Sequence, residues 1–144
     1  MKFTRKANAH WYGTGKEGKG HINTGSKVLE DTPYSFGTRF EGEKKGTNPE
    51  ELLGAAHAGC YTMQLSFLLN EEGFTADHLH TDANVTFEDG EITQVYLNLV
   101  GEVPEISEEK FKEIAEKAKN VCPVSKLFKT DIKLEIILNQ KSNG

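Results

Sequence analysis

The sequence predicts an α+β fold with the order three strands, one long helix, two strands, two further helices and a final strand. Two observations carry this prediction. Apolar residues recur at helical spacing between Pro49 and Glu72, whereas apolar and polar residues alternate with the period of a strand on both sides of that stretch. The chain has 144 residues, of which 36% are hydrophobic, so we expect one compact domain over residues 1–144.

Three strands are expected before the long helix. Residues 2–12 and 21–24 partly alternate, and the polar segment GTGKEGKG between them predicts a β-hairpin. Residues 35–41, SFGTRFE, alternate again and predict a third strand. Successive side chains of a strand point to opposite faces, so Arg39 is expected on the face opposite its aromatic neighbours.

The long helix has clear start and stop signals. Asn48 is a good N-cap, Pro49 suits the first helical position, and Glu51 completes a pattern similar to a capping box. Gly73 is a natural stop, which gives a helix roughly 36 Å long at 1.5 Å per residue. One face of it is expected to be buried between sheets, which two subunits could supply. That face carries Leu53, Ala56, Cys60, Met63 and Phe67.

The segment after the long helix predicts a second hairpin, two helices and a last strand. Strand-like residues 79–88 and 91–103 flank Asp89-Gly90, a strong hairpin signal. The last strand is expected over residues 130–139.

The first of the two helices is capped by Ser107. Its inner side is expected to carry Phe111, Ile114, Ala115 and Ala118. Pro123 predicts the first position of the second, short helix, which places Cys122 at its N-cap.

Composition and charge narrow the possible functions. The formal net charge is −5 and the isoelectric point is about 5.6, whereas duplex-binding proteins normally carry a basic field, so no nucleic acid is expected as a partner. The chain begins without the core of a secretory signal, and no stretch approaches roughly 18 consecutive apolar residues, so no membrane is expected either. We therefore expect a cytoplasmic protein with two reduced cysteines.

Two short motifs have simple explanations. Residues 13–18, GTGKEG, match the dinucleotide pattern GxGxxG, but a strand follows where a phosphate site needs a helix, so a hairpin tip is favoured. His78 and His80 share a face of a predicted strand and could bind a metal. No third ligand is obvious nearby, and half-buried or surface histidines are commoner.

Cys60 admits three interpretations. Free cysteine is among the most buried residue types, so a core residue is the simplest of them. His57 lies three residues away on the predicted helix, and together with Cys122 the two could ligate zinc in a dimeric metal- or ligand-binding protein, although no fourth ligand is apparent. The third interpretation is a reactive nucleophile.

Three features favour the nucleophile. Cys122 is placed at a helix N-terminus, where the helix dipole lowers the pKa of a thiol. Arg39 could stabilise a thiolate, and Glu50, in the first turn of the helix that carries Cys60, could orient Arg39. Taken singly, Arg39 is as well explained by a surface charge and Glu50 by an acid that the helix dipole favours.

Two segments closely resemble the OsmC branch of the OsmC/Ohr hydroperoxide reductases. They are YSFGTRFEGEKKGTNPEELLGAAHAGCYTM, residues 34–63, and NVCPVSKLFKTDIKLEI, residues 120–136. The similarity extends from AHWYG, residues 9–13, to the final strand. The loop EKKG, residues 43–46, is one lysine longer than is usual in the family, but it precedes the helix and should not disturb the chemistry.

The resemblance implies an intertwined α+β homodimer, with long central helices packed between β-sheets of both chains and two active sites at the interface. Cys60 matches the peroxidatic cysteine of the family and Cys122 the resolving one. Arg39 and Glu50 match the polar pair that activates the sulfur.

The chemistry implied is reduction of organic hydroperoxides, and more weakly of hydrogen peroxide, through a Cys60 sulfenic acid and a Cys60–Cys122 disulfide. An external dithiol, which the family suggests is a lipoyl protein, restores the thiols. No metal, flavin or haem is expected as a cofactor. An apolar substrate pocket could form from Phe36, Phe40, Tyr61, Met63 and Phe67.

Overall fold

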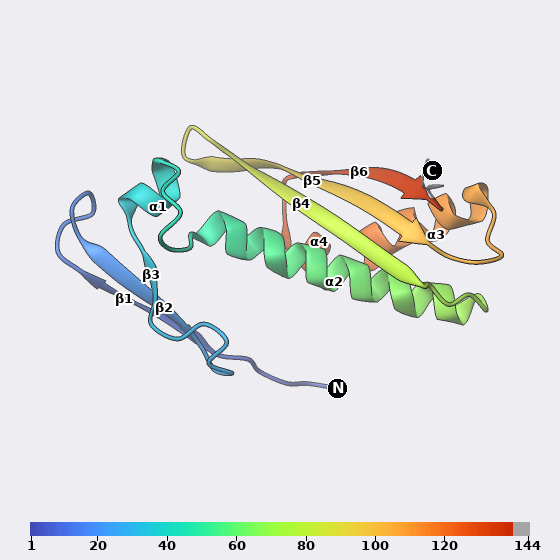
Figure 1. The fold of residues 1–144 in the computed structure, drawn as a ribbon, viewed down its shortest axis with the longest axis horizontal. Coiled ribbons are helices and arrows are strands. Elements are labelled where there is room, and N and C mark those ends of the chain that lie inside the picture. The colour runs from blue at the N-terminus through green and yellow to red at the C-terminus, as the bar shows by residue number, and fades with distance from the viewer. Residues whose placement is uncertain (140–144) are drawn as a thin grey trace, which may run out of the picture. The chain divides into compact units, whose positions relative to one another are not determined.

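The computed structural model describes residues 1–139. They form a mixed α+β fold with two three-stranded sheets and one long helix, α2 (Pro49–Glu71), as Figure 1 shows. The chain divides between Leu52 and Leu53 into two compact units, each of which is described by itself. The expected order of strands and helices is confirmed except around residues 35–41.

The first unit is built on an antiparallel sheet. Its strands β1 (Ala7–Tyr12), β2 (Lys19–Thr24) and β3 (Thr32–Tyr34) lie in sequence order. The predicted first hairpin is therefore confirmed, and β2 rather than a helix follows the glycine-rich turn. Gly20 in β2 lies where a Cβ atom would come within 2.6 Å of both Tyr34 and Trp11, so glycine is required for these aromatic rings to pack edge to face.

The strand predicted over residues 35–41 is wrong, because this segment forms the short helix α1 (Phe36–Phe40). The Ser35 side chain accepts a hydrogen bond from the Thr38 N–H, and the Thr38 hydroxyl accepts one from the Ser35 N–H. This reciprocal cap satisfies two amide groups that a strand would pair elsewhere. Consequently Arg39 does not lie opposite its aromatic neighbours, and its guanidinium lies 5.0 Å from the centre of the Phe40 ring.

The second unit contains the other sheet. Strands β4 (His78–Glu88) and β5 (Glu91–Glu102) form the predicted antiparallel hairpin, and β6 (Asp131–Leu138) pairs with β5 in parallel. The hairpin turn uses Asp89 and Gly90, both with positive φ, as an Asp-Gly turn requires. A parallel pair needs a crossover connection, which the two remaining helices provide.

These helices are α3 (Glu108–Val121) and α4 (Pro123–Leu127). Both predicted starts are confirmed: the Ser107 hydroxyl accepts from the Lys110 N–H at 3.1 Å, and Pro123 is the first residue of α4. The face of α3 predicted to be buried is buried. It packs into a core with α2 and β5, whose fully buried members include Tyr61, Leu65, Leu69, Val95, Leu97, Val103, Phe111, Ala115, Ala118 and Cys122.

The face of α2 that faces this core is not the predicted one. Its buried residues are Gly54, His57, Tyr61, Leu65, Leu68 and Leu69. Within the predicted stripe, Met63 is 64% exposed and Phe67 59% exposed. Helix α2 carries apolar residues on two faces at helical spacing, and spacing alone does not say which of them the chain covers itself. Burial of the predicted stripe against a second subunit stays a prediction.

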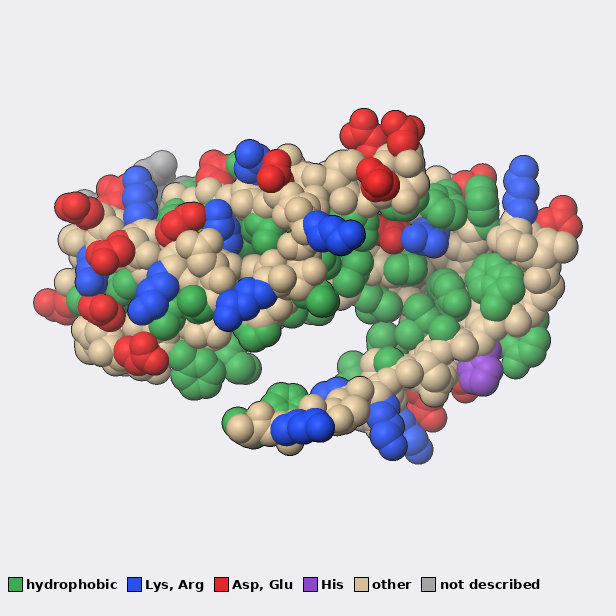
Figure 2. Space-filling view, turned by 180° about the vertical axis from the view of Figure 1, so that it is seen from behind, with side chains coloured by type: hydrophobic (Ala, Val, Ile, Leu, Met, Phe, Trp, Pro, Cys, Tyr) green, Lys and Arg blue, Asp and Glu red, His purple; other side chains and the backbone are tan. Residues whose placement is uncertain are grey.

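The surface of the second unit has a charged region and an apolar edge. Seen from behind in Figure 2, acidic and basic side chains are interspersed over it, and hydrophobic side chains gather along its lower edge. On α3 the charges include the ion pairs Lys112–Glu108 and Lys119–Glu116. In the part of the chain that the structure describes, no helix is both long and apolar enough to cross a membrane.

Candidate active site

The two cysteines of the chain meet in the second unit. Cys60 is half-buried on α2, and Cys122 is fully buried between α3 and α4. The Cys122 thiol donates a hydrogen bond to the Cys60 sulfur, with 2.8 Å between the two Sγ atoms, and the two are free thiols. Residues 62 positions apart in sequence thus place two oxidisable thiols side by side.

Cys122 occupies a fixed corner of the backbone. It is the C-cap of α3, where its N–H donates to Ala118 O, and also the N-cap of α4, where its carbonyl accepts from the Lys126 N–H, both at 3.0 Å. Its predicted position at a helix N-terminus is therefore confirmed. Within the described residues its side chain makes no capping hydrogen bond on α4, and the thiol donates to Cys60 instead.

The immediate surroundings of Cys60 do not favour a thiolate. Burial raises the pKa of the Cys60 thiol above its ordinary value, and a hydrogen bond from the Val124 backbone acts in the opposite direction. Cys60 lies in the interior of α2, so it cannot use the positive end of that helix. A cation close to Cys60 would favour its thiolate.

A histidine close to this sulfur pair has a different role from the one considered in the sequence. His57, on α2, is fully buried, and its Nε2 lies 2.8 Å from the Ser125 hydroxyl on α4. Its Nδ1 has no partner among the described residues, and its ring packs against Phe128 with 5.3 Å between centroids. Burial lowers the pKa of His57, which favours the neutral ring.

The contact with Ser125 was missed in the sequence. The sequence gives only weak evidence for this contact, because Ser125 is one of several polar residues after Pro123 and no neighbouring residue indicates that it is buried. The described residues contain no group of three or more histidine, cysteine, aspartate or glutamate side chains placed to hold a metal ion. The structure thus does not favour the zinc interpretation of His57, Cys60 and Cys122. His80, for its part, pairs with Asp82 at 3.0 Å.

The other two predicted site residues meet in the first unit. Arg39 Nε and Nη2 donate to the two carboxylate oxygens of Glu50, each at 3.0 Å. Such a two-point contact is stronger and more directional than a single ion pair. It raises the pKa of Arg39, so the guanidinium stays charged. The Arg39 side chain is 36% exposed and that of Glu50 14% exposed.

Local structure holds this ion pair in place. Asn48 Oδ1 accepts from the Glu51 N–H at 2.8 Å, which confirms Asn48 as the N-cap of α2. The same side chain donates through Nδ2 to Thr38 O at 3.2 Å, which ties α1 to the start of α2. The four predicted site residues therefore form two pairs, one in each unit.

An aromatic pocket of about 240 Å³ adjoins Arg39 in the first unit. Phe36 and Phe40 line it as expected, together with Trp11 and Tyr34, which were not predicted. The two phenylalanines are one helical turn apart and their rings pack at 5.0 Å between centroids. Of the other expected pocket residues, Tyr61 is fully buried in the core, where its hydroxyl donates to Ala115 O.

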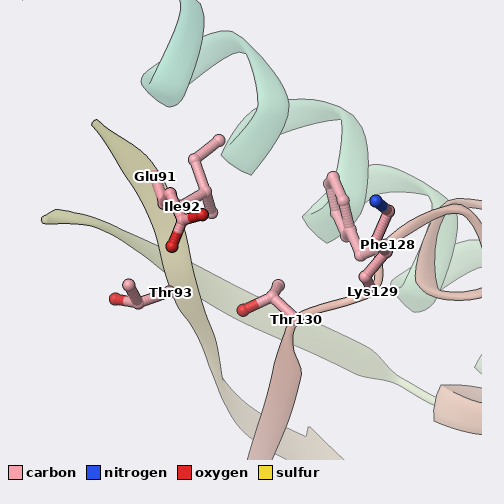
Figure 3. Close-up of a pocket in the computed structure, with 6 residues that line it drawn as sticks. All are labelled: Glu91, Ile92, Thr93, Phe128, Lys129 and Thr130. Carbon is pink, nitrogen blue, oxygen red and sulfur yellow. The ribbon is translucent and has the colours of Figure 1, made fainter. Parts of the chain in front are cut away.

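A larger hollow of about 560 Å³ lies in the second unit between the start of β5 and the start of β6 (Figure 3). It is lined by Glu91, Ile92, Thr93, Phe128, Lys129 and Thr130. None of these residues is a cysteine. Phe128, which lines this hollow, also packs against the His57 ring.

Comparison with known proteins gives a consistent result. A family model described as OsmC-like protein matches residues 42–137. The protein named peroxiredoxin OsmC from Escherichia coli (strain K12) is 48% identical over 139 residues, which cover 94% of this chain and 96% of that protein.

Solved structures agree on the fold. The crystal structure of the organic hydroperoxide resistance protein OhrB of Bacillus subtilis has 26% sequence identity and a TM-score of 0.67, covering 95% of this chain and 98% of that one. An OsmC-like protein from Mycoplasma pneumoniae, 14% identical, superposes with a TM-score of 0.75, covering 97% of this chain and 100% of that one.

Proposed function

Because the chain belongs to the OsmC-like family, we propose that it is a cysteine-based peroxidase that reduces organic hydroperoxides to alcohols. The observation that carries this proposal is the contact between the free thiols of Cys60 and Cys122, 2.8 Å apart and the only cysteines of the chain. A peroxidase of this kind needs a hydroperoxide as substrate and a reductant. It needs no metal, flavin or haem, because sulfur carries the electrons.

The proposed reaction has two steps on sulfur. The Cys60 thiolate attacks one oxygen of the peroxide bond; that bond breaks, the leaving alkoxide takes a proton to become an alcohol, and Cys60 becomes a sulfenic acid. The Cys122 sulfur then attacks Cys60, a disulfide forms, and the sulfenic hydroxyl leaves with a proton as water. The half-buried position of Cys60 suits the first role and the buried position of Cys122 the second.

We assign activation of Cys60 to Arg39. The support is that burial raises the pKa of the Cys60 thiol, so an added cation is needed to keep it ionised at neutral pH. Glu50 orients the guanidinium through its two hydrogen bonds. Arg39 remains charged at any pH the enzyme meets, so it can favour a thiolate but cannot exchange protons with it.

We propose that the active form is an intertwined homodimer with two active sites at its interface. The support is the exposed apolar face of α2, where Met63 and Phe67 lie on the same side as Cys60. Side chains of this size contribute more stability when a second surface covers them. In such a dimer the Arg39 that serves a given Cys60 can come from either protomer.

Organic hydroperoxides are the proposed substrate class, with hydrogen peroxide reduced more weakly. The aromatic pocket beside Arg39 offers apolar surface to an organic group, which hydrogen peroxide lacks. The protein from Bacillus subtilis bears organic hydroperoxide resistance in its name. An external dithiol, for which a lipoyl protein is our candidate, regenerates the thiols by exchange. The cytoplasmic location expected from the sequence remains a prediction, and it fits regeneration by a thiol.

A peroxide-consumption assay tests the proposal. Purified protein is mixed with a dithiol and either an alkyl hydroperoxide or hydrogen peroxide, and loss of peroxide is followed over time. We expect multiple turnovers with both and faster turnover with the alkyl compound. Absence of turnover with either peroxide, in protein whose thiols are fully reduced, would contradict the proposed function.

A further inference from the structure

The second unit holds a polar contact in an otherwise apolar core. His57 is 0% exposed and Ser125 7% exposed, and their 2.8 Å hydrogen bond joins residues 68 positions apart. The His57 ring packs against the Phe128 ring. A buried hydrogen bond of this kind is directional, whereas the surrounding apolar contacts are not.

The hydrogen bond between His57 and Ser125 joins the same two segments as the contact between the two sulfurs. His57 precedes Cys60 by one helical turn on α2, and Ser125 follows Cys122 by the same three residues at the start of α4. Residues three apart on a helix lie on the same side of it. Two side-chain contacts, one between sulfurs and one between nitrogen and oxygen, therefore join the same two segments side by side.

The segment that carries Cys122 needs such a support. Helix α4 has only five residues, too few for stability by itself, and Leu127 in it is 75% exposed. Among residues 1–139, no side chain makes a capping hydrogen bond at its start. Ser125 is the buried residue of α4, so its hydrogen bond to His57 is a directional contact that holds this short helix against α2, in addition to the hydrogen bonds that Cys60 receives from Cys122 and from the Val124 backbone.

We propose that the hydrogen bond between His57 and Ser125 is a positioning contact for the second chemical step, holding the Cys122 thiol against the Cys60 sulfenic acid. This inference rests on the proposed function. In that step the S–S bond forms, the S–O bond of Cys60 breaks, the Cys122 thiol proton leaves with the hydroxyl as water, and the Cys122 sulfur is oxidised while the Cys60 sulfur is reduced. His57 and Ser125 are positioning residues and touch no reacting atom in this scheme.

The test separates the two steps in the full-length protein. Reduced protein receives one equivalent of alkyl hydroperoxide, and rapid quenching measures sulfenic acid and disulfide over time. Ser125→Ala should leave formation of the sulfenic acid within about two-fold of wild type and slow disulfide formation roughly ten-fold or more, because small errors in position are costly when two groups must meet. Ser125→Thr keeps the hydroxyl and should restore most of the disulfide rate.

A second variant removes the α2 partner of the His57–Ser125 hydrogen bond. His57→Phe removes the ring nitrogens but keeps a ring against Phe128, and it should reproduce the slow second step of Ser125→Ala. The double variant should be no slower than either single one, because both changes remove one bond. Thr62→Ala is the matched control: it removes the 2.7 Å hydrogen bond from α2 to Thr81 on β4 and should leave the ratio of the two rates unchanged.

The possible results have different meanings. Slowing of both steps alike, unchanged disulfide formation, or failure of Ser125→Ala and His57→Phe to fold would each overturn the inference and leave the contact as general support of the fold. Failure of the proposed function has a separate signature, since wild-type protein would then form no disulfide with peroxide at all. If wild-type protein turns over and the variants lose only the rate of disulfide formation, the proposed function and the positioning role of the His57–Ser125 contact are both supported.

Discussion

The two pairs of candidate residues have contrasting environments. Cys60 and Cys122 meet inside the second unit, one half-buried and one fully buried, where Cys122 is part of the hydrophobic core and Cys60 packs against it. Arg39 and Glu50 meet in the first unit on the short helix α1 and the first turn of α2, where the arginine side chain is 36% exposed. The position of the cysteine pair is therefore determined by packing, and that of the Arg39–Glu50 pair by electrostatics and helix capping.

The contrast indicates a division of labour. The sulfur pair determines whether the reaction can occur, because no other residue can form its covalent intermediates. In the proposed mechanism the ion pair sets how fast the reaction is at a given pH, because we expect it to raise the fraction of Cys60 that is ionised. Variants of the first pair should lose repeated turnover, and variants of the second should lose rate by degrees.

The sharpest test is at Cys60. Cys60→Ser should abolish peroxide consumption completely, since an alcohol at this position cannot form a sulfenic acid. The measurement is steady-state consumption of an alkyl hydroperoxide with excess dithiol. Normal turnover in this variant would mean that Cys60 is an ordinary core residue.

Cys122→Ser should behave differently. Each chain should reduce about one equivalent of peroxide and then carry a trappable sulfenic acid at Cys60, open to further oxidation, because no nearby thiol resolves it. Mass spectrometry after reaction with a sulfenic-acid reagent measures this product. A variant without any trappable oxidised form of Cys60 would contradict the assignment of the two roles.

The next largest effect is expected on assembly. Wild-type protein should be a dimer at micromolar concentration, with an interface above about 2,000 Å². Replacing both Met63 and Phe67 by aspartate should raise the dimer dissociation constant roughly a hundred-fold or more, since each buried side chain of this size contributes about 1.5–3 kcal/mol. Light scattering over a dilution series measures it. Val28→Asp, at an 84% exposed position in the first unit, is the control.

The graded effect is expected at Arg39. Removing its charge with Arg39→Met should raise the kinetic pKa of Cys60 and cut the oxidation rate at pH 7 roughly ten-fold or more, at about 1.4 kcal/mol per pKa unit. The rate should recover as pH rises above that pKa, where the thiol ionises without help. The measurement is the pH profile of Cys60 oxidation in a Cys122→Ser background.

Two comparisons make this test specific. Glu50→Gln should give a smaller loss, because it loosens the guanidinium without removing its charge. Arg5→Met is the matched control, since Arg5 also lies over an aromatic ring in the first unit, that of Phe3. If Arg39→Met gave the pH profile of Arg5→Met, Arg39 would be a surface charge.

The smallest effect is expected in the aromatic pocket. Phe40→Ala removes one wall of it and should lower the preference for alkyl hydroperoxide over hydrogen peroxide a few-fold, by weakening contact with the organic group. The ratio of the two kcat/KM values measures this preference. An unchanged ratio would place the organic group elsewhere.

Local signals made most of the fold predictable from sequence. The caps Asn48 and Ser107, the stop at Gly73 and the Asp89-Gly90 turn are read from a few adjacent residues, and they mark element ends correctly. Residues 35–41 were misread because alternation over seven residues fits a strand as well as one turn of helix. A Ser-x-x-Thr cap decided between the two, and that variant of the capping box is easily overlooked.

Site residues were predictable where family motifs or helix caps mark them, as for Cys122 at the start of α4. The partner of His57 was not, because hydrogen bonds between residues 68 positions apart depend on how the helices pack. Periodicity likewise identified an apolar face of α2 but not the face that the chain itself buries. That choice belongs to tertiary structure, since α3 and β5 supply the surfaces against which Tyr61 and Leu65 pack.

The wide separation of the two cysteines in the chain links chemistry to thermodynamic stability. A disulfide between residues 62 positions apart closes a long loop and removes much of the freedom of the unfolded chain. In the chain-entropy model that restriction stabilises the folded state by roughly 4 kcal/mol. The oxidised protein should therefore resist unfolding better than the reduced one, so its melting temperature would rise and fall with each catalytic cycle.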